Sequence, residues 1–290
     1  MNETYSYHAY GLAVSSCLPL PEFVSHDGVP EVTVCWGECT RNPPVQQENE
    51  WYYENTNGEA ILCHGTVGQV VIRDGNKIVI SPTPGVKTRP LQLFVSGVAF
   101  AVVIHQRGGL ALHASAVEID GKTIAFMGSK GCGKSSLSAA LYFTGHRLIT
   151  DDLMAVDCTC EPITVHPGYP QIKLTEETAS ALGCDYDSMV AVRPIQGKAG
   201  LIAKDGFASD SLPLGAICSL EQGPTVQIEP LSQGDAFTEL LHHSLLKGDV
   251  PHFERCVRVA SNVPFFRIMH PRSLSGLSDL AKSVGQYFSG

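Results

Sequence analysis

The octapeptide at residues 128–135, GSKGCGKS, matches the phosphate-binding pattern G-x-x-x-x-G-K-[ST] in full. Glycines in such a loop let backbone N–H groups converge on phosphate oxygens, and the following helix adds the partial positive charge of its N-terminus. We expect Lys134 to reach the β- and γ-phosphates of a nucleotide and the Ser135 hydroxyl to bind Mg²⁺. A Gly-rich turn without a ligand is the alternative. The predicted nucleotide-binding residues are Gly128, Ser129, Lys130, Gly131, Cys132, Gly133, Lys134, Ser135 and Ser136.

Two adjacent acids, Asp151 and Asp152, follow the apolar segment at residues 147–150. If that segment is a strand of a parallel sheet, its end lies beside the phosphate loop, at the edge where ligands bind. Phosphoryl transfer requires an acid that organises the metal and a group that handles the nucleophile. Two neighbouring carboxylates can divide these tasks, whereas an exposed acidic turn is the structural alternative.

Other basic residues are weaker candidates for the same site. His113 interrupts an apolar segment shortly before the loop, where it is either a site residue or a packed histidine. A cation must also neutralise the transferring phosphoryl group. Lys198, Arg193 and Lys204 flank a Gly-rich stretch and are the candidates, with solvated surface bases as the alternative. A further group is expected to be surface bases, with capture of an acidic group as the other interpretation: Arg255, Arg258, Arg267, His270 and Arg272.

The elements that position these residues alternate between strands and helices. An apolar run at residues 124–127 predicts a buried strand before the loop, and residues 134–143 predict a helix after it. Further strands are expected at residues 110–119, 147–156, 214–220 and 263–269, and helices at 235–246 and 275–288. This alternation predicts an α/β domain, with α+β character overall.

Residues 1–88 predict a smaller β-rich module, and residues 89–290 predict the phosphate-loop domain. Segments 70–73 and 77–80 flank Asp74-Gly75-Asn76, which is typical of a hairpin turn. Pro90 precedes an apolar run up to His105 that predicts a buried helix. We expect this run to be too short for the roughly 20 residues of a membrane-spanning helix.

The 290 residues carry a formal net charge of −9, so a basic footprint for nucleic acid is not expected. The N-terminal residues lack the pattern of a signal peptide, and the ten cysteines are interpreted as reduced thiols. We therefore expect a cytoplasmic protein that binds neither nucleic acid nor membrane.

The segment LHASAVEIDGKTIAFMGSKGCGKSSLSAALYFTGHRLITDD resembles the catalytic core of the HPr kinase/phosphorylase family. The resemblance implies a fold similar to phosphoenolpyruvate carboxykinase and transfer of phosphate from ATP to a protein serine. It further implies that Asp151 is the base toward the seryl hydroxyl and that Asp152 helps Ser135 to hold metal. His113, Lys134 and Lys198 complete the catalytic set that the resemblance implies.

Two departures from that family bear on the substrate. The family signature Glu-Ile-Arg-Gly corresponds here to Gln171-Ile172-Lys173-Leu174, and glutamine cannot supply the carboxylate charge. The opening Tyr10-Gly11-Leu12 with Leu18-Pro19-Leu20-Pro21 resembles HPr-kinase-related enzymes that tailor lasso peptides. That resemblance implies a peptide partner whose C-terminal serine is phosphorylated. An HPr-type kinase/phosphorylase, a small-molecule kinase and a non-catalytic nucleotide-binding protein stay open, as does a homo-oligomer.

Overall fold

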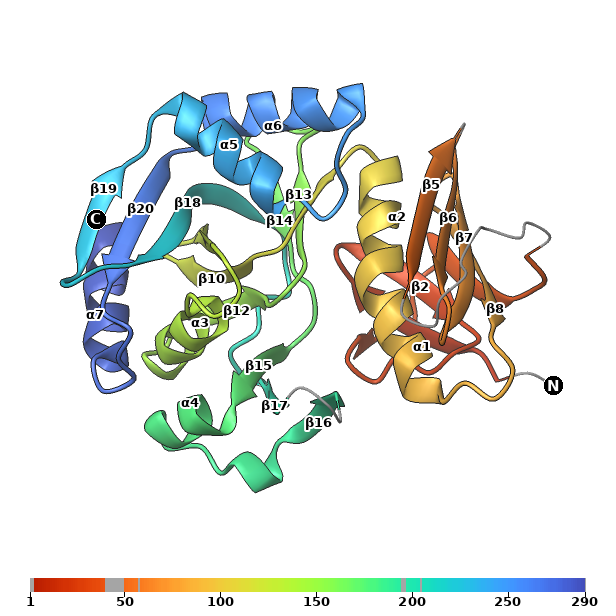
Figure 1. The fold of residues 1–290 in the computed structure, drawn as a ribbon, viewed down its shortest axis with the longest axis horizontal. Coiled ribbons are helices and arrows are strands. Elements are labelled where there is room, and N and C mark those ends of the chain that lie inside the picture. The colour runs from red at the N-terminus through yellow and green to blue at the C-terminus, as the bar shows by residue number, and fades with distance from the viewer. Residues whose placement is uncertain (1–2, 40–49, 57, 194–196, 204, 290) are drawn as a thin grey trace.

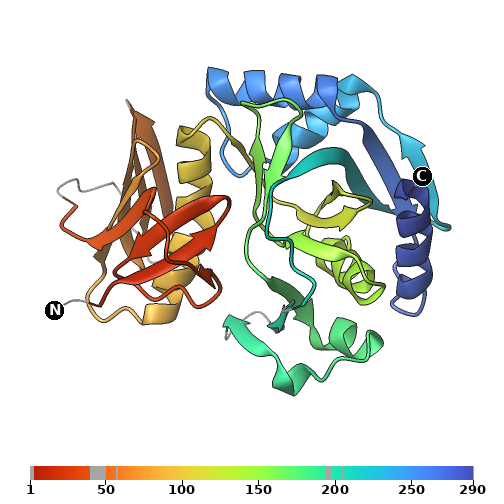
Figure 2. The same ribbon diagram turned by 180° about the vertical axis from the view of Figure 1, so that it is seen from behind.

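The computed structural model describes residues 3–39, 50–56, 58–193, 197–203 and 205–289, and within them three β-sheets and several helices form a mixed α/β protein. Figures 1 and 2 show the N-terminal sheet on one side, the larger second sheet on the other, and a long helix between them. The predicted α/β class is confirmed at this coarse level.

The first sheet has eight strands within the described residues, in the spatial order β3-β1-β2-β4-β8-β7-β6-β5. The β7–β8 hairpin turns through Asp74 and Gly75, whose φ angles of 49° and 61° are the positive values such a turn requires. The predicted hairpin is therefore confirmed. The strands are β1 (Tyr5–Ala9), β2 (Leu12–Ser16), β3 (Val24–Ser25), β4 (Val32–Trp36), β5 (Trp51–Thr56), β6 (Glu59–His64), β7 (Gly68–Arg73) and β8 (Lys77–Pro82).

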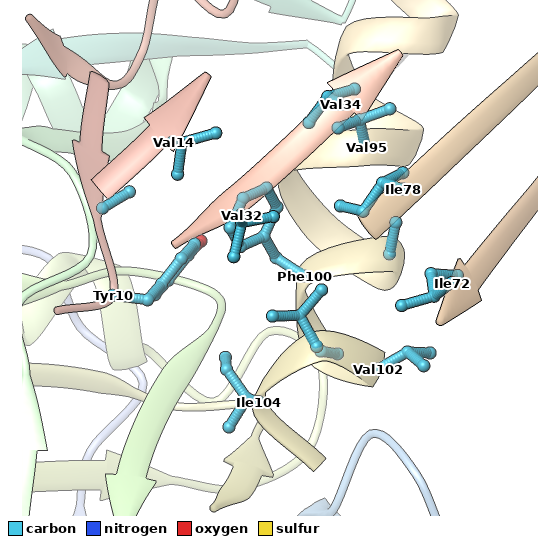
Figure 3. Close-up of a cluster of buried hydrophobic side chains, with 14 of the residues drawn as sticks. Tyr10, Val14, Val32, Val34, Ile72, Ile78, Val95, Phe100, Val102 and Ile104 are labelled. Carbon is cyan, nitrogen blue, oxygen red and sulfur yellow. The ribbon is translucent and has the colours of Figure 1, made fainter. Parts of the chain in front are cut away.

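A helix from Thr88 to Gln106 covers this sheet and consists of α1 (Thr88–Phe94), a π-helical turn η1 (Val95–Ala99) and α2 (Phe100–Gln106). Val95, Phe100, Val102 and Ile104 lie in one buried cluster with side chains of β2, β4, β7 and β8, as Figure 3 shows. The expectation that this run is too short to span a membrane was wrong. The helix of 19 residues passes that test by length and composition, although 67% of its apolar window is buried inside the protein.

The second sheet contains nine strands among the described residues, and β11, β18 and β20 are its parallel centre. The strands are β9 (Leu110–Leu112), β10 (Ser115–Ile119), β11 (Lys122–Met127), β12 (Arg147–Thr150), β13 (Met154–Asp157), β14 (Thr164–His166), β18 (Leu212–Gln222), β19 (Gln227–Pro230) and β20 (Phe265–His270). Because β10 is antiparallel to both β11 and β12, the carboxyl ends of β11 and β12 lie at the same edge. The sheet is mixed, which corrects the expectation of a parallel sheet around Asp151.

Two predicted strands are each divided in two at a candidate site residue. The predicted strand at 110–119 breaks at His113, and the predicted strand at 147–156 breaks at Asp151. β12 pairs with β10, whereas β13 pairs with β9 and β14. His113 lies in the first break and Asp152 in the second, and both line a cavity beside the phosphate loop.

Helices cover both faces of the second sheet. α3 (Lys134–Phe143) and α7 (Leu277–Phe288) pack on one face, and α5 (Gln233–His243) and α6 (Val250–Asn262) pack on the other. The predicted bounds of α3 are confirmed. The helix α6 was not predicted from the sequence, because a histidine and a cysteine are among the residues that it buries. These residues are His252, Cys256, Val259 and Ala260. Their i, i+4, i+7, i+8 spacing is nevertheless helical.

A third, three-stranded sheet of described residues, in the order β15-β17-β16, lies below the phosphate loop in Figure 1. Its strands are β15 (Gln171–Thr175), β16 (Val190–Arg193) and β17 (Lys198–Ile202), and α4 (Glu176–Ala181) and the 3-10 turn η2 (Tyr186–Ser188) connect β15 to β16. The division of the chain at residue 88 stays a prediction. The helix Thr88–Gln106, which was assigned to the second part, shares a core with the first sheet.

Candidate active site

The phosphate loop connects the end of β11 to the start of α3, as the pattern predicts. Gly128, Gly131 and Gly133 have φ angles of 140°, 87° and 103°, a region that side chains with a Cβ atom rarely adopt. At Gly128 a Cβ atom would lie 2.8 Å from the backbone oxygen of Leu220. No side chain caps the N-terminus of α3, so its first N–H groups face the loop. Backbone N–H groups gathered at a helix N-terminus in this way are suited to bind an anion.

Lys134 and Ser135 begin α3 and direct their side chains toward the loop and the acids. The Lys134 ammonium donates to the carbonyl oxygens of Gly128, at 2.7 Å, and Ser129, at 3.4 Å. The Ser135 hydroxyl donates to Oδ1 of Asp151 at 2.8 Å. The long lysine side chain is thus held across the loop, where its charge faces any phosphate that binds there.

Asp151 lies at the end of β12 and is 1% exposed. Its carboxylate accepts hydrogen bonds from the hydroxyl groups of Ser115 and Ser135 and, at 2.9 Å, from the backbone N–H of Lys173. Burial and the adjacent Asp152 carboxylate raise the pKa of Asp151, against the hydrogen bonds from Ser115 and Lys173, which lower it. Asp151 is therefore held rigidly below the cavity surface.

Asp152 is the acid that opens to the cavity. Its φ angle is 73°, a left-handed conformation that aspartate tolerates better than most residues, and its side chain is 36% exposed. The Lys173 ammonium forms an ion pair with Oδ2 of Asp152. Burial by itself would raise the pKa of Asp152, but the charge and hydrogen bond of Lys173 hold it below its ordinary value, and Lys198 acts in the same direction.

His113 lies in the break between β9 and β10. Its Nδ1 donates to the backbone oxygen of Asp152 at 3.0 Å, which leaves Nε2 as an acceptor in the neutral ring. Burial, followed by the charge of Lys134, lowers the pKa of His113 from its ordinary value of 6.5. The imidazole is consequently neutral at pH 7 and supports the backbone that presents Asp152.

Lys173 is a site residue that sequence analysis missed. The resemblance pointed to this segment only as the place of a lost glutamate, Gln171. That glutamine does not line the cavity; it is 2% exposed, and its Oε1 has no hydrogen-bond partner in the part of the chain described. Because alternate residues of a strand share a face, the sequence could have placed Lys173 and Thr175 on the same face as Gln171. No signal in the sequence indicated that Lys173 lies next to Asp152.

A cavity of about 1460 Å³ extends from the phosphate loop, and several predicted residues lie on its surface. Lys130 and Ser136 line it, and the Ser136 hydroxyl lies 3.4 Å from the hydroxyl of Thr178. Lys198, at the start of β17, lines the same cavity. Of the other cation candidates, Lys204 and the side chain of Arg193 lie outside the described part of the structure.

The C-terminal bases divide into two groups. Arg255, Arg258 and Arg267 bond elsewhere: Arg255 donates to the carbonyl of Gly109, Arg258 to that of Cys160, and Arg267 to Glu221. His270 and Arg272 line the cavity, and Nε2 of His270 lies 3.0 Å from the carbonyl oxygen of Cys132. Arg272 is exposed, so both interpretations, surface base and capture of an acidic group, stay predictions for these two residues.

The donor set fits a nucleotide with Mg²⁺. The Ser135 hydroxyl would be a ligand for Mg²⁺, which prefers oxygen atoms, and Asp151 would hold that hydroxyl in place. Among the described residues no group of three or more His, Cys, Asp and Glu side chains could hold a metal by itself. Burial raises the pKa of the Cys132 thiol in the loop, so this cysteine is poorly reactive.

Comparison with solved structures finds likenesses to 53 chains, and one of them is described here. No protein-family model and no curated protein matches the chain. The chain is similar to the structure of the Hpr(Ser) kinase/phosphatase from Coxiella burnetii, with 15% sequence identity, a TM-score of 0.34, and coverage of 62% of this chain and 93% of that chain. A TM-score of 0.34 is too low to support a function, so the function proposed below depends on the site itself.

Proposed function

We propose that the chain is an ATP- and Mg²⁺-dependent kinase that transfers the γ-phosphate to a serine hydroxyl of a peptide or protein. The observation that carries the proposal is the contact of the phosphate-loop hydroxyl of Ser135 with Asp151, beside a second carboxylate, Asp152, that faces a large cavity. A phosphate loop alone supports binding. A loop with two differently placed carboxylates supports transfer.

The nucleotide substrate binds with its phosphates at the loop and the N-terminus of α3. Lys134 exchanges its bonds to the carbonyls of Gly128 and Ser129 for bonds to phosphate oxygens. Lys198, on the cavity wall, supplies positive charge to the transferring group. Mg²⁺, when bound through Ser135, neutralises negative charge on the phosphates.

The two acids divide the work in the opposite sense to the one that the family resemblance implies. Asp151 fits the metal side, because it is buried and holds the Ser135 hydroxyl. Asp152 fits the role of base, because it lines the cavity and Lys173 keeps it ionised. The Asp152 carboxylate accepts the seryl proton, the seryl oxygen bonds to the γ-phosphorus, and the bond to the bridging oxygen breaks to release ADP.

The acceptor that we favour is the C-terminal serine of a lasso-peptide precursor. This choice follows from the sequence resemblance at residues 10–21, and the cavity volume of about 1460 Å³ leaves room for a peptide beside a nucleotide. An HPr-type protein and a small alcohol are the other acceptors to be compared in the same assay.

Mass spectrometry of candidate acceptors after incubation with ATP and Mg²⁺ tests the proposal. Transfer adds about 80 Da per phosphate to a serine. Binding of ATP without transfer to any precursor peptide, protein or small alcohol would contradict the kinase assignment and leave a nucleotide-binding protein.

The role of each acid is tested with Asp151→Asn and Asp152→Asn. We expect Asp151→Asn to raise the Mg²⁺ concentration needed for half-maximal rate, and Asp152→Asn to lower kcat by about 10²-fold or more with the same Mg²⁺ requirement. Asp120→Asn is the matched control, since Asp120 also has a positive φ angle, 50°, but lies in an exposed turn. Full transfer by Asp152→Asn would overturn its assignment as the base.

A further inference from the structure

The helix that covers the N-terminal sheet also forms one wall of the cavity. Leu93, Ser96, Gly97 and Val98 line it, and the last three lie in the π-helical turn Val95–Ala99. π-Helical turns are rare and often occur at functional sites. Ser96, Gly97 and Val98 of the turn face the cavity, whereas Val95, Ala99 and most of the α-helical residues on either side pack in the core.

This wall is on the side of Asp152. The Tyr10 hydroxyl donates to the carbonyl oxygen of Ser96 at 3.2 Å, and the Tyr10 ring lies 6.2 Å, between centroids, from the ring of Tyr169, which also lines the cavity. Leu153, the residue after Asp152, packs in the same core cluster as the helix and reaches the cavity as well. An acceptor that approaches Asp152 therefore meets the π-helical wall.

The two walls differ in chemistry. The Asp152 side carries a group of apolar residues, Leu93, Val98, Leu153, Val192 and Leu245, next to the charged Asp152, Lys173 and Lys198, and no charged side chain of the helix Thr88–Gln106 lines it. The opposite side carries His270, Arg272, Ser273 and Ser275 together with Leu274 and Leu277, and it meets the phosphate loop at Cys132. The cavity volume of about 1460 Å³ also exceeds the roughly 300–1,000 Å³ typical of a pocket for one small ligand.

We infer that the wall Leu93–Val98 is the acceptor subsite and takes the apolar side chains that precede the C-terminal serine of an extended peptide. The nucleoside then occupies the polar side at residues 270–276. The inference rests on the proposed function and deepens it, because it assigns the N-terminal part of the chain to the recognition of the acceptor.

A bulky side chain introduced on each of the two walls, to block that part of the cavity, tests this assignment in the full chain. A Cβ atom at Gly97 or at Gly276 meets nothing within 4 Å, and neither residue has a positive φ angle, so leucine is tolerated at both positions. The probes are two synthetic peptides with a single, C-terminal serine, one with leucines before the serine (leucine-flanked) and one with glycines there (glycine-flanked). Affinities are measured by calorimetry with ADP and Mg²⁺ present, and ADP–Mg²⁺ affinity is measured separately.

We expect the leucine-flanked peptide to bind about tenfold more tightly than the glycine-flanked one, as expected for apolar contacts in a pocket. Gly97→Leu abolishes this preference and leaves ADP–Mg²⁺ affinity unchanged, whereas Gly276→Leu lowers ADP–Mg²⁺ affinity and leaves the peptide preference unchanged. Val98→Thr keeps the side-chain shape and removes apolar surface. This variant reduces the peptide preference without blocking the cavity.

Three results would overturn the acceptor subsite. The two peptides bind equally, or both fail to bind while ADP–Mg²⁺ binds. The third is a peptide preference that is unchanged in both Gly97→Leu and Val98→Thr. Failure of the proposed function has a different signature. In that case ADP–Mg²⁺ does not bind, or the peptide preference and its response to Gly97→Leu are present but no phosphate is transferred from ATP.

Discussion

Lys173 forms an ion pair with Asp152 through its ammonium group, and its backbone N–H donates to the neighbouring Asp151 at 2.9 Å. One residue of β15 thus holds both carboxylates of the site, the first as a buried acceptor and the second as an ionised group at the cavity surface. Burial would lower the pKa of Lys173, but Tyr169 and Asp152 raise it above its ordinary value, so the ammonium stays charged.

Removal of the Lys173 charge is expected to change the pH profile. In the native protein the pKa of Asp152 is below its ordinary value of 3.8, so the ionised form persists above that pH and is lost only as pH falls through the lowered pKa. In Lys173→Met only His113 and Lys198 still oppose the effect of burial on the pKa of Asp152, so the acid limb of kcat/KM moves to higher pH. Lys173→Arg restores the limb toward its native position, whereas Lys122→Met, at an exposed residue, leaves it unchanged. The same profile in Lys173→Met would contradict this role.

Replacement of Lys134 is expected to weaken both nucleotide binding and transfer. Lys134→Met removes the cation that the loop carbonyls hold at 2.7 and 3.4 Å, and loss of such an electrostatic group costs about 10²–10³-fold in rate. Calorimetry with ADP–Mg²⁺ and a rate assay on the same preparation measure the two effects. Lys77→Met, in the exposed β7–β8 hairpin, is the control. Native affinity and rate in Lys134→Met would exclude phosphate binding at this loop.

Gly128→Ala is expected to destabilise the fold. The new Cβ atom would lie 2.7 Å from Sγ of Cys132 and 2.8 Å from the backbone oxygen of Leu220, at a φ angle of 140°. Such strain costs about 1–3 kcal/mol, which urea denaturation at equilibrium can measure. In Gly234→Ala the nearest atom is 3.9 Å away and the glycine lies in a helix, so the change stays within about 0.5 kcal/mol. Equal stability of the two variants would refute the steric argument.

Asp249 is expected to stabilise α6 through both a helix cap and a charge. Its side chain accepts from the backbone N–H of His252 at 2.8 Å and lies 2.7 Å from Nε2 of His105. Asp249→Ala should cost about 1 kcal/mol in the free energy of unfolding, whereas Asp249→Asn keeps the cap and loses only the charge.

The pH dependence separates these two contributions. Burial would raise the pKa of Asp249, but its hydrogen bonds to His252 and His105 lower it below 3.8. The charge therefore stabilises the fold above the unfolded-state pKa, and its contribution is lost as pH falls through the folded-state value. We expect the difference between the native protein and Asp249→Asn to shrink with acidification, as followed by denaturation at several pH values. A difference that grows on acidification would show that the sign is wrong.

Local features of this protein were predicted well because short segments determine them. The hairpin turn at Asp74 and Gly75 needs only residues that tolerate a positive φ angle, and α3 needs only the loop before it and an apolar face. Strand continuity was predicted less well. Whether a chain continues as a strand after Thr150 depends on its pairing partners, and these change there from β10 to β9 and β14.

The amino-acid sequence by itself determined that residues 128–135 form a glycine-rich loop with the phosphate-binding pattern, since its glycines, Lys134 and Ser135 stand at adjacent positions. Only the tertiary structure decided which acid meets Ser135, that Lys173 holds Asp151 and Asp152, and that a helix of the N-terminal part borders the cavity. The physical reason is that these contacts join residues far apart in the chain. Such contacts form only when sheets and helices pack, and no local pattern encodes that packing.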